Sequence, residues 1–379
     1  MKQFILFSLI IFVSCVSVPK KEMILEESES ESEPSLEVYN LTNRAFDSEK
    51  SEKSALELTS PLLNKPLYKF SPQELDKYLA FLQKYEPDLQ KRIQHLAKQA
   101  VGQPYEIYLL GEFPFEIYDT QPLYNLEKSD CVVFSEHIYA MALSDNWKKF
   151  FTMLQRIRYK DGIISILTRN HFTEADWVIN NSWLIENITE KLPSVKFRKV
   201  KTIIDRAKFF SKWDLGQDIP IQELEWAYIP ASEVSKAIKH LKTGDFVNVV
   251  RGFTPESVFV GHVGIISVEE DGTVNLIHST TPEVKIESLI DYMNNSLSLN
   301  KRREKENKKI LKENIIISRY NDSLRTINNG IPHPDEKSLI PFKPYFYGFS
   351  FFRLRENALD NLRAIDGDKA PRVVVYGEN

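Results

Sequence analysis

The segment HVGIISVEEDGTVNLIHS, residues 262–279, contains two apolar runs separated by a short polar turn, with a histidine in each run. The runs have the composition of β-strands, and the EDG between them fits a three-residue hairpin loop that ends on a left-handed glycine. In the register that this loop sets, Gly264 faces His278, and His262 is a diagonal neighbour of His278 on the same face of the sheet. A loop with an even number of residues would turn one histidine to the opposite face. The segment therefore predicts a hairpin on which two imidazoles converge.

A possible nucleophile for these imidazoles lies earlier in the chain. Cys131 follows a Ser-Asp pair and opens the run CVVFSEHIYAMAL, whose apolar spacing predicts a helix that begins near the cysteine. A thiol in the first turn of a helix faces unpaired N–H groups and the positive end of the helix dipole, so we expect its pKa to be lowered. Taken alone, a cysteine is more often a core residue. The two histidines favour the interpretation as a nucleophile.

Three roles follow from this trio. An imidazole beside a thiol can take its proton and later give it to a leaving amine, and a second polar group can hold the first ring in one tautomer. We therefore expect Cys131 to be the nucleophile, His262 the base and His278 the orienting residue. A zinc site is the weaker interpretation, because the trio has no evident fourth ligand and the chain has no H-E-x-x-H spacing. We expect no metal and no cofactor.

The composition limits the class of protein. The chain has 379 residues, of which 42% are hydrophobic and 12% aromatic, as in a globular protein. A net charge of −4 argues against general nucleic-acid binding. With only two cysteines, Cys15 and Cys131, there is neither a disulfide framework nor a repeated cysteine spacing for structural zinc.

The N-terminal residues MKQFILFSLIIFVSC indicate export. A basic start and a short apolar run that ends in Val-Ser-Cys predict a lipoprotein signal peptide over residues 1–14, with Cys15 as the lipidated first residue of the mature protein. Ordinary cleavage near Ser14 and an uncleaved anchor are the alternatives. Residues 15–65 are rich in Ser and Glu and predict a disordered tether. We expect a membrane-anchored protein of the bacterial cell envelope, facing the periplasm or the cell surface, with a single catalytic domain over residues 66–379.

The order of elements in that domain predicts an α+β fold. Ser71-Pro72-Gln73-Glu74 has the residues of a capping box and predicts a helix to about Ala100 with a break near Pro87. A second helix is predicted from Trp147 to Arg158. Strand-like runs follow at 245–250, 262–268, 273–278 and in GFSFFRLRE, so helices precede an antiparallel sheet. We interpret the charged stretch KRREKENKKILKEN as a solvated insertion.

Substrate-binding residues are predicted from composition. A polar and aromatic cluster between residues 169 and 181 could line a sugar- or peptide-binding cleft through Arg169, His171, Trp177 and Asn180, although ordinary loop packing is nearly as good an interpretation. Asp130, beside the predicted nucleophile, could hold a free amine of a substrate or could only cap the helix.

The motifs GQPY, DC, GDFV, GHVGII and LIHST, in that order, resemble the NlpC-type papain-like cell-wall cysteine peptidases. More closely, GQPY, NLEKSDCVVFSEHIYAMAL, IRYKDG and HFTEADWVINN resemble the N-acetylmuramoyl-L-alanine amidase-like branch, from about Gly102 to Arg355. VVFSE replaces the more usual TFVE, and HFTEADW and the region after His278 carry extra residues.

The resemblance implies a papain-like core, in which the helix with the nucleophile packs on an antiparallel sheet with extra helices and insertions. It also implies a Cys-His-His site that cleaves amide bonds of peptidoglycan, and it adds Tyr105 of GQPY to the substrate-binding candidates. The alternatives are a stem-peptide endopeptidase of the same fold and a non-catalytic envelope-binding lipoprotein. We expect peptidoglycan or muropeptides and the membrane as partners, and no nucleic acid.

Overall fold

The computed structural model describes residues 60–375, which form two compact units. One unit comprises residues 60–309 and 342–375, and the other comprises residues 310–341. The predicted signal peptide, the lipidated Cys15 and most of the predicted tether lie outside the described residues.

Helices come first in the larger unit, as predicted. The capping box is present, because the Ser71 hydroxyl accepts from the Glu74 backbone N–H and the Glu74 carboxylate accepts from the Ser71 N–H. The helix that was predicted as one with a break near Pro87 is two helices, α2 (Pro72–Tyr85) and α3 (Leu89–Gln99). The next two are α4 (Cys131–Ala142) and α5 (Trp147–Arg158), which begin at the residues that the sequence predicted.

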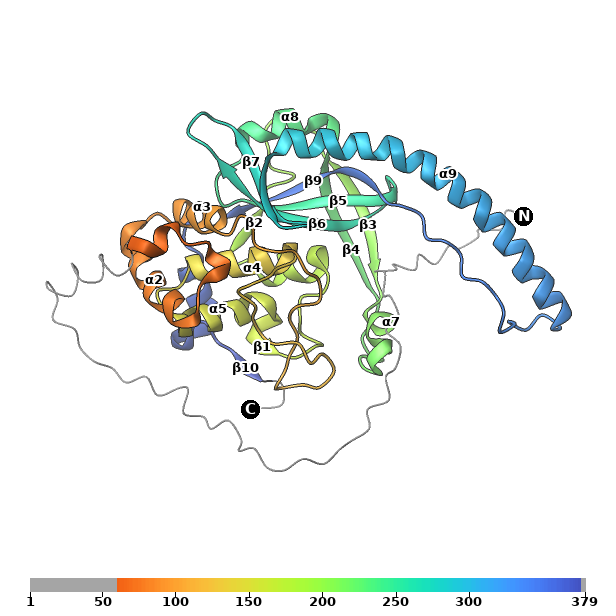
Figure 1. Ribbon diagram of the computed structural model, residues 1–379, viewed down its shortest axis with the longest axis horizontal. Coiled ribbons are helices and arrows are strands. Elements are labelled where there is room, and N and C mark those ends of the chain that lie inside the picture. Colours follow the sequence, from red (N-terminus) through yellow and green to blue (C-terminus); the bar gives the residue numbers. More distant parts are fainter. Residues whose placement is uncertain (1–59, 376–379) are drawn as a thin grey trace, which may run out of the picture. The chain divides into compact units, whose positions relative to one another are not determined.

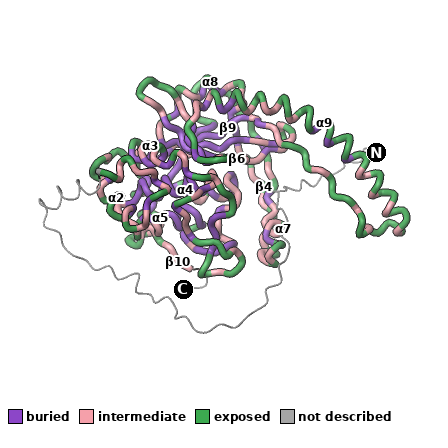
Figure 2. Tube along the Cα trace, in the orientation of Figure 1, coloured by how far each residue is buried: buried purple, intermediate pink, exposed green. Residues whose placement is uncertain are grey.

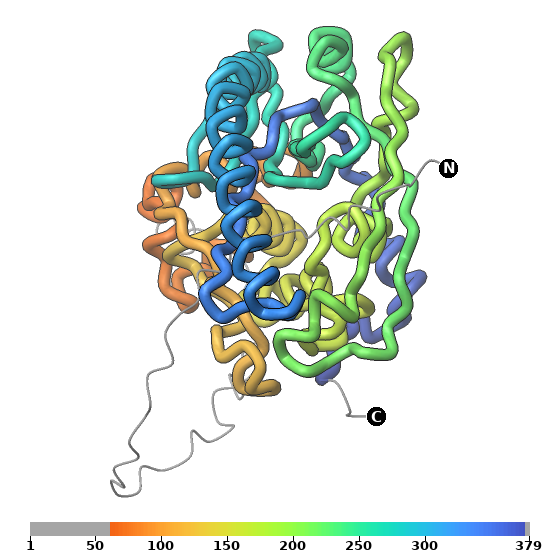
Figure 3. The backbone as a smooth tube through the Cα atoms, turned by 90° about the vertical axis from the view of Figure 1, so that its right-hand side faces the viewer, coloured from red at the N-terminus to blue at the C-terminus, as the bar shows by residue number. Residues whose placement is uncertain are grey.

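An eight-stranded antiparallel sheet follows, so the mixed α+β prediction is confirmed. Its strands are β2 (Ile185–Asn187), β3 (Arg198–Ile204), β4 (Gln222–Pro230), β5 (Phe246–Thr254), β6 (Ser257–Val268), β7 (Val274–Ser279), β8 (Val284–Ser288) and β9 (Tyr345–Leu354). Their order is β3-β4-β9-β5-β6-β7-β8, and β2 also pairs with β9. Strands β3 and β4 run side by side in Figure 3 (yellow-green and green). Strands β2, β3, β4 and β8 were not predicted.

The β6–β7 hairpin has the predicted register. Ile265 pairs with Ile277 and Val268 with Val274, which places Gly264 opposite His278. The loop closes on Gly272, whose φ of 83° is in the left-handed region. Strand β6 begins earlier than predicted and contains an irregularity next to His262, since Val249 pairs with His262 but Val250 pairs with Val260. Such a bulge redirects side chains beside functional sites.

Each face of the sheet packs into its own hydrophobic core. Helices α2 to α5 pack on one face, where Phe246, Val263 and Ile265 are buried against α4. On the other face, Val247 and Val249 are buried against α8 (Val234–Ala237) and the first turn of α9 (Leu289–Ile327). Figure 1 shows α4 and α8 on opposite sides of β5 and β6, and Figure 2 shows the buried residues concentrated in these layers.

The remaining elements are short. They are η2 (Ser60–Asn64), η3 (Leu67–Lys69), η4 (Lys160–Gly162), the π-helical turn η5 (Thr173–Trp177), α6 (Val178–Asn180), α7 (Arg206–Phe210), η6 (Ser211–Trp213), η7 (Ala231–Glu233), η8 (Ile238–His240), α10 (Ala358–Asp366) and η9 (Gly367–Lys369). A separate parallel pair joins β1 (Ile163–Ile164) to β10 (Val374–Val375). Within residues 60–375, no helix combines the length and the apolar character needed to cross a membrane.

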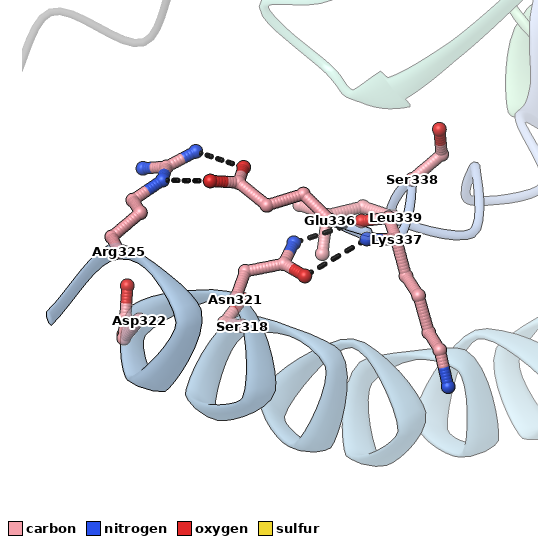
Figure 4. A pocket seen from close by; sticks show the side chains of 8 residues that line it. All are labelled: Ser318, Asn321, Asp322, Arg325, Glu336, Lys337, Ser338 and Leu339. Atoms are coloured by element: carbon pink, nitrogen blue, oxygen red, sulfur yellow. Dashed lines mark hydrogen bonds and ion pairs between the residues drawn. The ribbon is translucent and has the colours of Figure 1, made fainter. Parts of the chain in front are cut away.

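The charged stretch predicted as an insertion is part of the 39-residue helix α9. Four asparagines of α9 are spaced seven residues apart. The side-chain amide of each one donates to the backbone C=O, and accepts from the backbone N–H, of one residue in the segment that follows the helix. The pairs are Asn300 with Phe346, Asn307 with Lys343, Asn314 with Ile340, and Asn321 with Lys337, with distances of 2.7 to 2.9 Å. Figure 4 shows the Asn321 pair beside the two-pronged ion pair of Arg325 with Glu336. We call this set the asparagine ladder.

Candidate active site

The two histidines converge as the sequence predicted. Nε2 of His262 lies 2.6 Å from Nδ1 of His278, and the two rings are nearly perpendicular, at 80°. The opposing Gly264 makes this possible, because a Cβ at that position would lie 3.0 Å from Cβ of His278. Tyr292 of α9 covers the pair, with its ring parallel to His262 and edge-on to His278. Because Nε2 of His262 makes this contact, Nδ1 is the ring nitrogen of His262 that takes no part in it.

A carboxylate that the sequence analysis missed completes the chain of contacts. Oε1 of Glu287 on β8 lies 2.9 Å from Nε2 of His278 and 2.6 Å from Nζ of Lys285. The hydrogen bond from His278 and the Lys285 ammonium lower the pKa of Glu287, whereas burial lowers the pKa of both histidines. Recognising VKIES as a third strand beside the hairpin would have placed Glu287 next to His278.

Cys131 is the first residue of α4 and is partly exposed. Val263, the residue after His262, is buried in the hydrophobic cluster against which Cys131 packs. The thiol therefore lies beside the strand that carries the predicted base. Among the described residues, the thiol makes no hydrogen bond to either imidazole, a contact that often tightens only when substrate binds.

The predicted lowering of the Cys131 pKa is wrong. Burial, followed by the negative charge of Asp130, raises the pKa of the thiol to about 12, which outweighs the backbone N–H groups. Asp130 adds to the effect of burial, because its Oδ1 accepts from the N–H groups of Val132 and Val133, at 2.9 and 2.8 Å, beside the thiol. The first turn of α4 is thus capped by a carboxylate. The positive end of the α4 dipole faces this carboxylate as well as the thiol.

Tyr105 is close to Cys131. Its backbone N–H donates to Pro282 O at 2.9 Å, and it forms a single bridge to Ser129, two residues before Cys131. Burial and the charges of Cys131 and Asp130 raise the pKa of its phenol to about 12. Arg251 contacts the tyrosine that covers the two histidines, because its half-buried guanidinium donates to the Tyr292 hydroxyl at 3.4 Å. Tyr105 remains a candidate for substrate contact, and Arg251 joins it.

Trp177 does not line a cleft, contrary to the prediction. Its side chain is 1% exposed, stacks on Phe246 with ring centroids 4.3 Å apart, and donates from Nε1 to Glu136 at 3.0 Å. Glu136 also pairs with the buried Arg158. These residues form a polar centre in the core beside α4, so Trp177 holds α4 in place and does not line a cleft.

The other members of the predicted cluster are also occupied by the fold. Arg169 forms ion pairs with Glu112 at 2.6 Å and Asp119 at 2.9 Å. His171 lies with Nε2 2.7 Å from Ile166 O, packed on Phe209 and Phe210, and burial lowers its pKa.

Asn180 donates to the Asn170 side chain at 2.7 Å. Arg169 and Asn180 do line a polar hollow of about 390 Å³, but its lining includes neither Cys131 nor the two histidines. Arg169 and Asn180 thus line a hollow as predicted, away from Cys131 and the two histidines, and Asp130 is the helix cap that the sequence left as an alternative.

Comparison with known proteins assigns the chain to a family. The family model described as AmiA-like, N-acetylmuramoyl-L-alanine amidase-like, matches residues 95–299, which is more than half of the chain and includes Cys131, His262, His278 and Glu287. The chain belongs to the N-acetylmuramoyl-L-alanine amidase-like family. No curated protein matches it.

Solved structures resemble this amidase-like protein at low identity. A protein from Legionella pneumophila of family model DUF1460 is 16% identical, with a TM-score of 0.56, over 79% of this chain and 96% of its own. An N-acetylmuramoyl-L-alanine amidase from Bacteroides uniformis is 17% identical, with a TM-score of 0.46, over 70% of this chain and 99% of its own. The first likeness supports the fold.

Proposed function

We propose that this amidase-like protein is a peptidoglycan hydrolase that cleaves the amide bond between N-acetylmuramic acid and L-alanine, with Cys131 as nucleophile. The observation that carries the proposal is the hydrogen-bonded pair of His262 and His278 beside the Cys131 helix, within the region that matches the family. The order of a helix with the cysteine and then two strands with the histidines also supports the papain-like core of the NlpC type.

The proposed reaction uses both states of His262. Nδ1 of His262 takes the thiol proton as Sγ of Cys131 attacks the lactyl carbonyl of muramic acid. When the tetrahedral intermediate collapses, the C–N bond breaks and the same nitrogen gives its proton to the departing amine of L-alanine. Water then hydrolyses the thioester in a second cycle of proton transfer. The backbone N–H of Cys131 is the proposed donor to the oxyanion.

The geometry favours an amidase over a stem-peptide endopeptidase. The endopeptidase alternative depended on Asp130 as the site for a free amine, but one oxygen of this carboxylate already accepts two N–H groups of α4. The role of Asp130 as the cap of α4 therefore supports the amidase over the endopeptidase. A purely binding protein would not need a thiol beside two linked imidazoles.

Digestion of intact muropeptides, with products identified by mass, tests this function. We expect sugar chains free of peptide and stem peptides that begin at L-alanine, with full activity in EDTA and none in the Cys131→Ala variant. Sugar products that all keep at least two amino acids would contradict the amidase and support the endopeptidase. Muropeptide binding without any product would support the binding protein, whereas loss of activity on chelation would contradict the thiol mechanism.

We also propose that Cys15 is lipidated and anchors the protein in the cell envelope, because it follows a short apolar run and Val13-Ser14. Cys15→Ala should move the protein from the detergent-soluble membrane fraction to the aqueous fraction. A variant that partitions as the wild type does would contradict the anchor.

A further inference from the structure

We propose that Glu287 is a positioning residue of the catalytic site, which fixes the protons of both imidazoles so that Nδ1 of His262 is the base toward Cys131. Its catalytic consequence rests on the proposed function, but the arrangement of protons can be measured without substrate.

The contacts form an unbranched chain. Nδ1 of His278 contacts Nε2 of His262 at 2.6 Å, and Nε2 of His278 contacts Oε1 of Glu287 at 2.9 Å. The His278 side chain is 1% exposed and that of Glu287 is 17% exposed, so bulk water has little access to either bond. Both nitrogens of His278 are therefore committed to protein partners.

Only one placement of the protons fits this chain of contacts. Glu287 is ionised near neutral pH, because the hydrogen bond from His278 and the Lys285 ammonium hold its pKa low, so its oxygen can only accept. Nε2 of His278 must then carry a proton. Burial keeps His278 neutral, so its Nδ1 has a lone pair and accepts from Nε2 of His262. Because His262 is neutral as well, its remaining nitrogen, Nδ1, is unprotonated.

The same chain stabilises the charge that forms during the reaction. When the Sγ–H bond of Cys131 breaks and an N–H bond forms at Nδ1, His262 becomes an imidazolium. Its Nε2–H already points to His278, and the Nε2–H of His278 points to the Glu287 carboxylate. A fixed anion at the end of the chain favours the positive ring in the low dielectric of the site. No further proton has to move between the rings.

The tautomers can be observed directly. Two-bond ¹⁵N–¹H correlation spectra of the wild-type protein should show the Nε2–H tautomer for both His262 and His278. Glu287→Gln should retain both tautomers, because the amide oxygen can accept from the same N–H. Glu287→Ala should bring in the second tautomer and lower kcat on muropeptides on the order of 10²-fold, with KM changed by less than about twofold.

Glu283→Ala is the matched control, because Glu283 is a carboxylate four positions before Glu287 whose side chain is exposed. This variant should keep both tautomers and nearly all of kcat. An Nδ1–H tautomer on either ring of the wild type would overturn the proposal, as would unchanged tautomers and kcat in Glu287→Ala. If Glu287→Ala does not fold, the wild-type spectrum still decides. Correct tautomers in a protein that cleaves no peptidoglycan would refute the proposed function and leave the role of Glu287 intact.

Discussion

Replacing Cys15 with serine leaves Cys131 as the only thiol of the chain, so alkylation by iodoacetamide then reports on Cys131 alone. The thiolate is the reactive form, and burial and Asp130 raise the thiol pKa to about 12 from an ordinary value of 9.0. A difference of about three pKa units lowers the thiolate fraction near neutral pH about 10³-fold. We expect alkylation of the substrate-free protein at about a thousandth of the rate of a model thiol.

The pH dependence of the alkylation rate and the Asp130→Asn variant test the causes of the slow reaction. The alkylation rate should rise tenfold per pH unit from pH 7 to 10 without an inflection, because the folded thiol pKa lies above this range. Asp130→Asn should increase the rate, since the amide oxygen can still cap α4 while the negative charge beside the sulfur is removed. The unfolded protein should react like a model thiol, which controls for reagent quality.

A rate near that of a model thiol at pH 7, with an inflection below pH 8, would refute this reasoning. It would mean that Cys131 and His262 form a thiolate–imidazolium pair before substrate binds. The slow rate would instead mean that both groups are neutral at rest and that the proton moves only as the carbonyl is attacked.

Four further outcomes are expected. His262→Ala should abolish muropeptide cleavage as completely as Cys131→Ala, whereas His278→Asn should retain a measurable fraction, because another polar group can partly orient the base; full activity in His262→Ala would exclude it as the base. Burial raises the pKa of the Glu174 carboxyl from 4.5 to about 7, so the folded protein favours the protonated carboxyl. The folded state therefore loses stability as the pH rises through 7 and this carboxyl ionises. Glu174→Gln should therefore be more stable than the wild type by about 3 kcal/mol at pH 8 and equally stable at pH 4, as measured by denaturant unfolding; equal stability at both pH values would contradict the burial argument. Gly264→Ala would place a methyl group 2.7 Å from Leu276 Cδ1 and 3.0 Å from His278 Cβ, so it should cost about 1–3 kcal/mol and disturb the imidazole pair. Wild-type activity and melting temperature in that variant would show that the strand can shift. Asn314→Ala should speed hydrogen exchange at the Ile340 amide and leave activity unchanged, with Glu313→Ala as the neighbouring control; unchanged exchange would mean that the bond contributes nothing.

Local signals in the sequence predicted the elements that local interactions decide. The Ser71 capping box, the start of α4 at Cys131 and the hairpin register all depend on residues within a few positions of one another. The seven-residue spacing of Asn300, Asn307, Asn314 and Asn321 was also present and would have indicated a helix, but the surrounding charges suggested an insertion.

The errors concern properties that distant partners set. Arg169 pairs with a glutamate 57 positions earlier, and Trp177 donates to a glutamate 41 positions earlier, so composition alone did not show that these two side chains have partners within the fold. The sign of the Cys131 pKa shift failed for the same reason, because the helix dipole is visible in the sequence and burial is not.

The asparagine ladder has a consequence for how this region can change in evolution. Seven helical residues rise about 10.5 Å and three extended residues span about 10 Å, so each rung of the ladder repeats at a common interval on both sides. Because the asparagines contact only backbone N–H and C=O groups, these hydrogen bonds place no restriction on the side chains at Ile340 and Lys343. Related chains should therefore differ in length here by seven residues in the helix matched with three in the returning segment, and an insertion of any other size should break the pairing.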